Sequence, residues 1–293
     1  MIDPALARLA SETAAFPYCA RLGVAVEYLA VDRARIRIPY DDANSNPGRA
    51  LHGGVAASTI DVAGVLAAWS GLPAWPPPEA GTLDLAVDYL AAAIGEDIVA
   101  ESAVLRRGKE IVYAEVDVRN DAGKRIAKGL VTHRALERAA AGAERRRLAR
   151  VEAPAGEGED VPPLARAIVS VPFIASLGMQ ITRMHDGHAI LRMPRTPDKG
   201  DAAGAIHEGA VAALVDTAGA MASWSVVGID FRYKASTVGI HVAFHAAAGE
   251  DLLAEARTWR RDDEIFQNQV TVSERGTRRV VATGAVTYRI VVP

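Results

Sequence analysis

The segment LHGGVAASTIDVAGVLAAW, residues 51–69, decides how this chain folds, because it is long, rich in alanine and apolar on nearly every side. Its length and alanine content favour a helix despite its β-branched residues. A helix without a polar face must be covered all round. We therefore expect a helix from about Gly54 to about Trp69 that lies inside a curved sheet.

The same segment recurs 155 residues later as IHEGAVAALVDTAGAMASW, residues 206–224. Of the 19 paired positions, 8 are identical. The same shift places Pro17 on Pro172 and Gly129 on Gly284. Self-similarity at one spacing over most of the chain indicates an internal duplication.

The duplication predicts two domains that are built in the same order. We place the N-terminal domain at residues 1–138 and the C-terminal domain at residues 164–293. Between them, residues 139–163 begin with a basic run and continue in proline, glycine and acidic residues, which is typical of a linker.

Alternating and glycine-bounded apolar runs indicate strands in each half. Residues 33–38 alternate as in a half-solvated antiparallel strand. Four later runs are expected to be successive strands of a meander: residues 82–90, 98–106, 110–119 and 124–134. The predicted fold class is α+β, with an antiparallel sheet wrapped around a central buried helix in each half. The two halves are expected to pair edge to edge as a pseudo-dimer, which removes exposed sheet edges.

The composition excludes several classes of protein. The chain has 293 residues, of which 50% are hydrophobic and 24% charged, and its net charge of -3 indicates no nucleic-acid partner. Cys19, the single cysteine, excludes an internal disulfide and a cysteine-ligated metal cluster. The longest run without a charged residue, residues 62–78, ends in prolines and is a poor membrane span, and residues 1–20 do not have the pattern of a secretory signal. We expect a cytoplasmic protein with no membrane partner.

Each copy of the long helix carries one acid in apolar surroundings, Asp61 in the first and Asp216 in the second. A carboxylate there is costly without a partner or a purpose. A hydrogen bond to a neighbouring strand would explain it in structural terms. Its presence in both copies favours a functional role instead, because acids in apolar surroundings often mark functional sites.

A histidine and glycines precede each helix, as His52-Gly53-Gly54 and as His207-Glu208-Gly209. Glycine allows a tight turn into the helix and leaves the first backbone amides open at the positive end of the helix dipole. Such an end can bind an oxyanion. A glycine helix cap beside a surface histidine is the plain structural alternative.

Taken together, these residues resemble a known family. His52-Gly53-Gly54 followed by Asp61, with Asn46 before the histidine and Thr82-Leu83-Asp84 opening the next strand, is similar to the hotdog-fold acyl-CoA thioesterases of the PaaI type. The resemblance extends over both copies and implies two tandem hotdog domains. It also implies an acyl-CoA substrate, no cofactor, and assembly into a homo-oligomer.

The resemblance implies a role for each matching residue. In that family the residue after the histidine supplies a backbone N–H that polarises the thioester carbonyl, and the preceding Asn assists. The helix Asp is the nucleophile or general base, and a Ser or Thr on the following strand helps to hold the water. Carried over to this sequence, these residues are Asn46, His52, Gly53, Asp61 and Thr82 in the first copy and Asp201, His207, Glu208, Asp216 and Thr237 in the second.

Helix geometry determines how the two copies cooperate. Gly53 and Asp61 are eight residues apart, which is roughly 12 Å along a helix, so one carbonyl cannot touch both. In the family that the chain resembles, each site takes its amide from one domain and its acid from the other, and this geometry requires that arrangement if both groups act on one thioester. Site one combines Asn46, His52 and Gly53 with Asp216 and Thr237. Site two combines Asp201, His207 and Glu208 with Asp61 and Thr82.

The two sites are predicted to be unequal. Site two has Asp201 where site one has Asn46, which replaces a neutral donor by an anion beside a developing negative charge. It also has Glu208 where site one has Gly53, which adds a side chain where glycine leaves space. We expect site one to be the principal catalyst and site two to be impaired, altered in specificity or vestigial.

The resemblance predicts hydrolysis of a small or medium acyl- or aryl-CoA thioester. The alternative is a non-catalytic acyl-CoA binding or sensing module, because one site departs from the catalytic pattern. An enoyl-CoA hydratase on the same fold would need a different Asp-His arrangement before the helix.

Charged and metal-binding groups give weaker predictions. CoA phosphates need cations, for which Arg106-Arg107 and Arg260-Arg261 are candidates, although solvated basic edges are a commoner explanation. No metal is expected, because His241 and His245 share one strand face but lack a third ligand.

Overall fold

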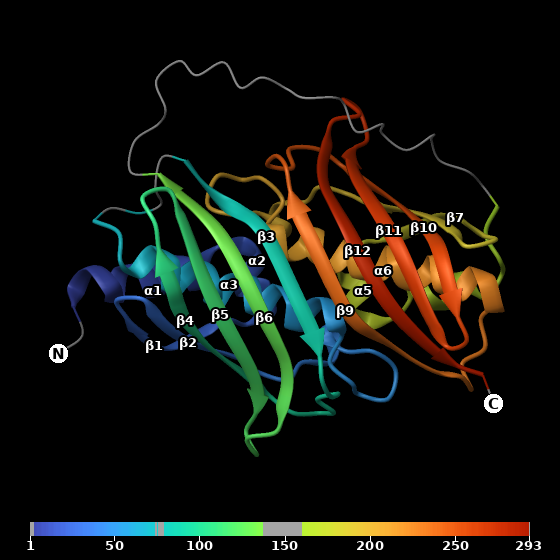
Figure 1. Cartoon of the computed structure of the whole chain (residues 1–293), viewed down its shortest axis with the longest axis horizontal. Helices are drawn as coiled ribbons and strands as arrows, with labels where there is room; N and C mark the ends of the chain where they lie inside the picture. Colours follow the sequence, from blue (N-terminus) through green and yellow to red (C-terminus); the bar gives the residue numbers. More distant parts are fainter. Residues whose placement is uncertain (1–2, 74, 76–78, 137–159, 293) are drawn as a thin grey trace.

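Twelve antiparallel strands form one continuous sheet, and two long helices, α3 and α6, lie against it (Figure 1). This is a computed structural model of the chain, and it describes residues 3–73, 75, 79–136 and 160–292. The predicted linker, residues 139–163, lies almost entirely outside the described residues.

Both halves contribute the same succession of elements. The first half contains α1 (Pro4–Ala15), α2 (Pro17–Leu22), β1 (Ala25–Ala30), β2 (Arg33–Ile38), η1 (Asp42–Asn44), α3 (Gly53–Ser70), β3 (Glu79–Tyr89), β4 (Ile98–Arg107), β5 (Ile111–Asn120) and β6 (Arg125–Leu136). The second half contains α4 (Ala165–Val169), α5 (Pro172–Ser176), β7 (Gln180–His185), β8 (His188–Met193), η2 (Pro197–Lys199), α6 (Glu208–Val227), β9 (Lys234–Phe244), β10 (Leu252–Asp262), β11 (Ile265–Glu274) and β12 (Val280–Val291).

The two halves meet at the pair β3 and β9 in the middle of the sheet (Figure 1). The strand order is β1-β2-β4-β5-β6-β3-β9-β12-β11-β10-β8-β7, so the second half repeats the first in reverse. Ala86 lies opposite His241, its equivalent under the shift of 155, and a pseudo-twofold axis therefore passes between them. The predicted α+β pseudo-dimer, with two hotdog domains paired edge to edge, is confirmed.

The predicted meander is wrong at one strand. Strands β4, β5 and β6 follow one another as expected, but β3 pairs with β6 and β9 rather than with β4. One edge of β3 pairs with β6, and its other edge pairs with β9 of the second half. The alternation of apolar and polar residues within one copy does not show which strands become neighbours. Strand β1 is an addition that the sequence pattern did not predict.

The helices α3 and α6 pack closely because small residues lie where they cross. A Cβ atom at Gly54 would lie 2.6 Å from Ala213 Cβ, and one at Gly209 would lie 2.9 Å from Ser58 Cβ. Both distances are shorter than any real contact, so only glycine fits at these two positions. The first turn of each helix is thereby held against the second turn of the other.

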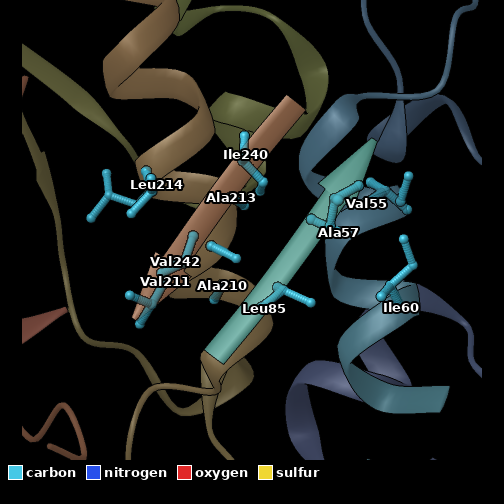
Figure 2. Close-up of a cluster of buried hydrophobic side chains, with 14 of the residues drawn as sticks. Val55, Ala57, Ile60, Leu85, Ala210, Val211, Ala213, Leu214, Ile240 and Val242 are labelled. Atoms are coloured by element: carbon cyan, nitrogen blue, oxygen red, sulfur yellow. The ribbon is translucent and has the colours of Figure 1, made fainter. Parts of the chain in front are cut away.

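The seam between the halves is a single apolar core (Figure 2). Figure 2 shows side chains of both helices beside those of the two central strands: Val55, Ala57 and Ile60 of α3, Ala210, Val211, Ala213 and Leu214 of α6, Leu85 of β3, and Ile240 and Val242 of β9. By length and composition both helices could span a membrane, yet 89% and 83% of their apolar windows are buried inside the fold. Their apolar surface is therefore explained by the core.

Candidate active site

His52 caps the N-terminus of α3. Its Nδ1 accepts the backbone N–H of Gly54 at 2.9 Å. Burial lowers the pKa of His52 to about 4, so the ring is neutral and carries its proton on Nε2. Helix geometry leaves the Gly53 N–H without an intrahelical acceptor, and this donor lies at the positive end of the dipole.

Asp216 of α6 meets this helix start across the seam. A Cβ atom at Gly53 would lie 2.9 Å from Asp216 Oδ2, and His52 Nδ1 is 3.9 Å from the same oxygen. Thr237 of β9 donates its hydroxyl to the other oxygen, Oδ1, at 2.5 Å. The Oδ2 atom is therefore the carboxylate oxygen that faces Gly53.

The environment of Asp216 sets its protonation. The residue is only 3% exposed, and burial raises its pKa to about 6, while the hydrogen bond from Thr237 opposes that rise. At neutral pH the group is ionised but close to its pKa. Such a carboxylate suits a base or a nucleophile.

All five residues predicted for site one line one cavity of about 580 Å³: Asn46, His52, Gly53, Asp216 and Thr237. Its apolar wall comes mainly from the C-terminal half of α6 and from nearby strands, and includes Ala220, Met221, Trp224, Tyr233 and Tyr288. Polar groups and an apolar wall thus share one cavity, as a site for an apolar chain with a reactive head group requires.

Tyr89 is a site residue that the sequence analysis missed. Its hydroxyl donates to the Gly53 carbonyl at 3.2 Å, and its ring would lie 3.4 Å from a Cβ at that glycine. Burial raises the pKa of Tyr89 well above its usual value, so the hydroxyl stays protonated. The repeat gives no signal for it, because the equivalent residue is Phe244.

Site two has the same frame. His207 Nδ1 accepts the Gly209 N–H at 3.0 Å, and Thr82 donates its hydroxyl to Asp61 Oδ1 at 2.6 Å. His207 Nδ1 lies 3.7 Å from Asp61 Oδ2. Burial raises the pKa of Asp61 to about 6 and lowers that of His207 to about 4. The five predicted residues line a cavity of about 410 Å³: Thr82, Asp61, Asp201, His207 and Glu208.

Glu208 makes the two sites different. Its carboxyl group lines the cavity beside Asp61 and Asp201. Burial, followed by the charge of Asp61, raises the pKa of Glu208 to about 8. Site two thus has a carboxyl group that is protonated at neutral pH, where site one has the bare backbone of Gly53.

Asp201 adds a third acid to site two. Its Oδ1 accepts the backbone N–H groups of Ala203 and Ala205 at 2.8 and 2.9 Å. The side chain therefore holds its own loop, and it donates no hydrogen bond as Asn46 could in site one. Its charge also contributes to the raised pKa of Glu208.

Possible metal ligands occur among the described residues. Asp61, His207 and Glu208 offer atoms that lie within 4.8 Å of one another. The Nδ1 lone pair of His207 is already used by the Gly209 N–H, however, so this ring is a poor ligand through that atom. His241, considered above with His245, contacts Asp84 Oδ2 at 2.7 Å instead.

The structure does not bring the candidate CoA-phosphate arginines to either cavity. Arg107 binds Asp32 and donates to the Ala68 carbonyl at 2.9 Å, near the C-terminal end of α3. In the other pair, Arg260 contacts Asp262 at 3.1 Å and Arg261 donates to the Asp263 carbonyl at 3.1 Å. Arg106 is exposed beside Arg107.

Family models match both halves of the chain. The model of the thioesterase superfamily matches residues 48–127, and the model of a domain of unknown function (DUF4442) matches residues 164–290.

Curated relatives match the chain over part of their length. A protein of Saccharolobus solfataricus named "putative esterase" is 32% identical over 109 residues, which are 37% of this chain and 76% of that protein. A Halobacterium salinarum protein of the same name is 43% identical over 100 residues, 33% of this chain and 66% of that one. The medium/long-chain acyl-CoA thioesterase YigI of Escherichia coli is 36% identical over 94 residues, and the match spans 28% of this chain and 61% of YigI.

Solved structures share the fold over nearly the whole chain. A hot dog fold protein of Alicyclobacillus acidocaldarius superposes with a TM-score of 0.65 at 17% identity, covering 96% of this chain and 98% of that one. The acyl-CoA thioesterase II TesB2 of Mycobacterium marinum gives a TM-score of 0.62 at 15% identity, covering 92% and 95%. By sequence and by fold, the chain belongs to the hotdog-fold thioesterase superfamily, as a tandem pair of hotdog domains.

Proposed function

We propose that site one hydrolyses acyl-CoA thioesters with a small or medium acyl or aryl chain. The observation that carries this proposal is the approach of Asp216 Oδ2 to the open start of α3 at Gly53. The name of the relative YigI supports the choice of acyl-CoA as substrate.

The residues of site one have distinct roles in this reaction. The thioester carbonyl oxygen accepts the Gly53 N–H, assisted by the amide of Asn46, and the helix end stabilises the negative charge that develops there. His52 is a positioning residue, because its Nδ1 holds the Gly54 N–H and orients the first turn. Tyr89 supports the same turn through the Gly53 carbonyl.

Asp216 supplies the reactive oxygen. Thr237 holds Oδ1, so Oδ2 either takes a proton from a water that attacks the carbonyl carbon, or attacks that carbon itself. In both routes the carbon–sulfur bond breaks and CoA leaves as the thiolate. In the second route water then hydrolyses the acyl–aspartyl anhydride.

Release of CoA tests the proposal. The purified chain is mixed with a panel of aryl-, short-chain and long-chain acyl-CoA thioesters, and free CoA is followed with a thiol reagent. Turnover is expected for short, medium or aryl chains. Binding of these thioesters without turnover would instead support the alternative, a non-catalytic acyl-CoA binding or sensing module.

Mass spectrometry of the enzyme quenched during turnover separates the two chemical routes. A peptide that contains Asp216 and has gained the mass of the acyl group identifies attack by the carboxylate. An unmodified peptide at every time point identifies attack by water.

We further propose that the protein is cytoplasmic and assembles into a homo-oligomer. Large apolar side chains are exposed on strands of both halves, namely Tyr113, Leu130, Val238 and Trp259. Exposed apolar side chains of this kind can bury surface in a further interface. Analytical ultracentrifugation is expected to give a mass above that of one chain, and a monomer would contradict the assembly.

A further inference from the structure

A cavity of about 660 Å³ adjoins the chamber of site two, and Glu208 lines both. The pairing of β3 with β9 ends at Asp84, which lies opposite Ala243. Residues 80–83 and 244–248 lie beyond this pair and line the cavity. We call it the gap cavity, because it lies where the two central strands stop pairing.

Apolar side chains form one part of the wall of the gap cavity. They belong to Ile206, Val211, Phe244 and Val281 and to the three alanines at 246–248. A concave site with apolar side chains and a few polar groups is typical of small-molecule binding. The polar groups then determine which class of small molecule fits.

Arg134 of β6 supplies the positive charge of the gap cavity, and no other Lys or Arg lines it within the residues that the structure describes. Arg134 is half-buried, so part of its side chain is accessible to a ligand. Its buried Nε has no hydrogen-bond partner, and its guanidinium forms no ion pair, within the described part of the chain. Buried polar groups without partners are rare and call for an explanation.

The equivalent arginine of the second half, Arg289, has a partner. It donates two hydrogen bonds to Glu264, at 2.9 and 2.7 Å, and it does not line the cavity of site one. Arg134 has the same register position, opposite an isoleucine that follows a glutamate, Glu110. Nevertheless no hydrogen bond or ion pair joins Arg134 to Glu110, both of which the structure describes. The unpaired guanidinium therefore distinguishes the side of site two from that of site one.

Three further titratable side chains line the gap cavity, Glu208, Asp201 and His245. Burial, followed by the charge of Asp61, raises the pKa of Glu208 to about 8, so its protonated form predominates at neutral pH and can donate a hydrogen bond. Burial lowers the pKa of His245, so its ring is uncharged at the same pH. Asp201 is then the acid that opposes an anionic ligand, and two backbone N–H groups of its own loop hold its Oδ1.

The donors of the gap cavity fit a carboxylate. The planar guanidinium of Arg134 can donate two parallel hydrogen bonds to a carboxylate, and such charge-assisted pairs are stronger than neutral ones. The protonated carboxyl group of Glu208 adds a donor in the same cavity. Arginine also binds phosphates, but the apolar side chains of this cavity match the chain of a carboxylic acid rather than the polar groups of a phosphate ester.

We propose that the gap cavity binds a carboxylic acid with an apolar chain, in its ionised form. Arg134 holds the carboxylate, and the chain lies against the apolar wall that includes Ile206, Val211 and Phe244. Binding here does not depend on hydrolysis in site one, although the acid that the proposed reaction releases belongs to this class of ligand.

Calorimetric titration of the full chain at neutral pH tests the class of ligand. The probes are octanoate, 1-octanol, n-octyl phosphate and CoA. We expect octanoate to bind at least roughly tenfold more tightly than each of the other three, because it alone combines a carboxylate with an apolar chain. Equal affinity for octanoate and 1-octanol would overturn the proposal. Tighter binding of n-octyl phosphate or CoA than of octanoate would overturn it as well, because the gap cavity would then be a phosphate site.

Matched variants locate the carboxylate. Arg134→Gln should weaken octanoate binding by roughly tenfold or more and leave 1-octanol binding unchanged, because only the carboxylate loses charge-assisted hydrogen bonds. Arg134→Lys keeps the charge but not the planar fork, so its affinity for octanoate should lie between those of Arg134→Gln and wild type. Arg289→Gln, the equivalent change in the second half, should leave octanoate affinity within about twofold of wild type.

Two results would contradict the location. Octanoate affinity that is equal in Arg134→Gln and wild type would show that this guanidinium does not hold the carboxylate. Loss of octanoate binding in Ala220→Phe, which fills the chamber of site one, would place the acid in site one if Arg134→Gln has no effect. Circular dichroism verifies that each variant is folded.

Discussion

Site one and site two share their frame but differ in chemistry. The hydrogen bond from Thr to Asp is 2.5 Å in site one and 2.6 Å in site two. The hydrogen bond from the backbone N–H of the glycine two residues after the histidine to the histidine Nδ1 is 2.9 Å in site one and 3.0 Å in site two. The difference lies in the residue after the histidine, which is Gly53 in site one and Glu208 in site two. A duplicated scaffold can thus keep its geometry while one side chain decides whether the helix end is available to a ligand.

The acids of the two sites also differ in access. The side chain of Asp61 is 1% exposed, and its Oδ2 has no hydrogen-bond partner among the described residues. The side chain of Asp216 is 5% exposed and lines the larger cavity. Three acids therefore lie together in site two beside one neutral histidine, and burial with the charge of Asp61 raises the pKa of Glu208 to about 8. In site one a single acid faces an open backbone donor, which is a complementary arrangement.

Removing the acid of each site tests the comparison most strongly. Asp216→Asn should lower kcat for acyl-CoA hydrolysis by roughly 10²–10⁴-fold, because the amide can neither attack nor accept a proton. Asp61→Asn, the matched change, should alter kcat by less than about threefold, since site two is not the principal catalyst. CoA release measures both variants. Equal losses would show that the two sites are equivalent, and a larger loss from Asp61→Asn would reverse their assignment.

Adding a side chain at Gly53 tests why site one needs glycine. A Cβ there would lie 2.9 Å from Asp216 Oδ2, so Gly53→Ala should displace the carboxylate and lower kcat/KM by roughly 10²-fold. The matched change Glu208→Ala, in site two, should leave kcat/KM for the same substrate within about threefold of wild type. Full activity of Gly53→Ala would mean that the approach of the acid to this helix start is not needed.

The pH dependence of hydrolysis should report the acid of site one. The Asp216 pKa of about 6 predicts that kcat/KM rises roughly tenfold per pH unit below that value and levels off above it. Asp61→Asn should leave this profile unchanged. A profile that instead rose up to about pH 8, and lost that rise in Glu208→Gln, would assign the activity to site two.

Chain-length preference should follow the chamber of site one alone. Ala220 lines that cavity, and its equivalent in site two is Val65. Ala220→Phe should reduce kcat/KM for long acyl chains by roughly tenfold relative to short ones, since the ring fills the chamber. Val65→Phe should leave the ratio unchanged. A shift of the ratio by Val65→Phe would show that acyl chains react from site two.

Much of this arrangement could be predicted from the sequence, for definite physical reasons. The helix expected from Gly54 to Trp69 runs from Gly53 to Ser70, because an apolar segment between a histidine cap and a glycine leaves few alternatives. The approach of Asp216 to Gly53 also followed, since the rise per residue prevents one helix from supplying both groups.

Other features depend on contacts that the sequence does not encode locally. The place of β3 beside β6 follows from its pairing with β9 in the other half. The raised pKa of Glu208 depends on its burial and on the nearby charge of Asp61. Tyr89 contributes through a hydroxyl that its equivalent Phe244 lacks. In each case the deciding contact is between residues far apart in the chain.

Stability as a function of pH gives the finest comparison between the sites. The Asp216 pKa is about 6 in the folded chain against 3.8 as its ordinary value, so the folded state favours the protonated acid. The stability that the protonated acid gives the folded state is fully present below about pH 4. It is lost as the pH rises through 6, and the loss in the free energy of unfolding is at most about 3 kcal/mol. Asp216→Asn removes the loss, so the variant should melt at a higher temperature than wild type above pH 6 and at an equal temperature below about pH 4.

The gain in melting temperature of Glu208→Gln over wild type should keep growing until about pH 8, because the pKa of Glu208 is raised further than that of Asp216. Thermal melts of both variants and of wild type, followed by circular dichroism across this pH range, measure the two curves. Gains that saturate at the same pH would mean that the carboxylates of the two sites experience equal burial and charge. The charge of Asp61 would then not act on Glu208, and the coupling between these two acids could not be what distinguishes site two from site one.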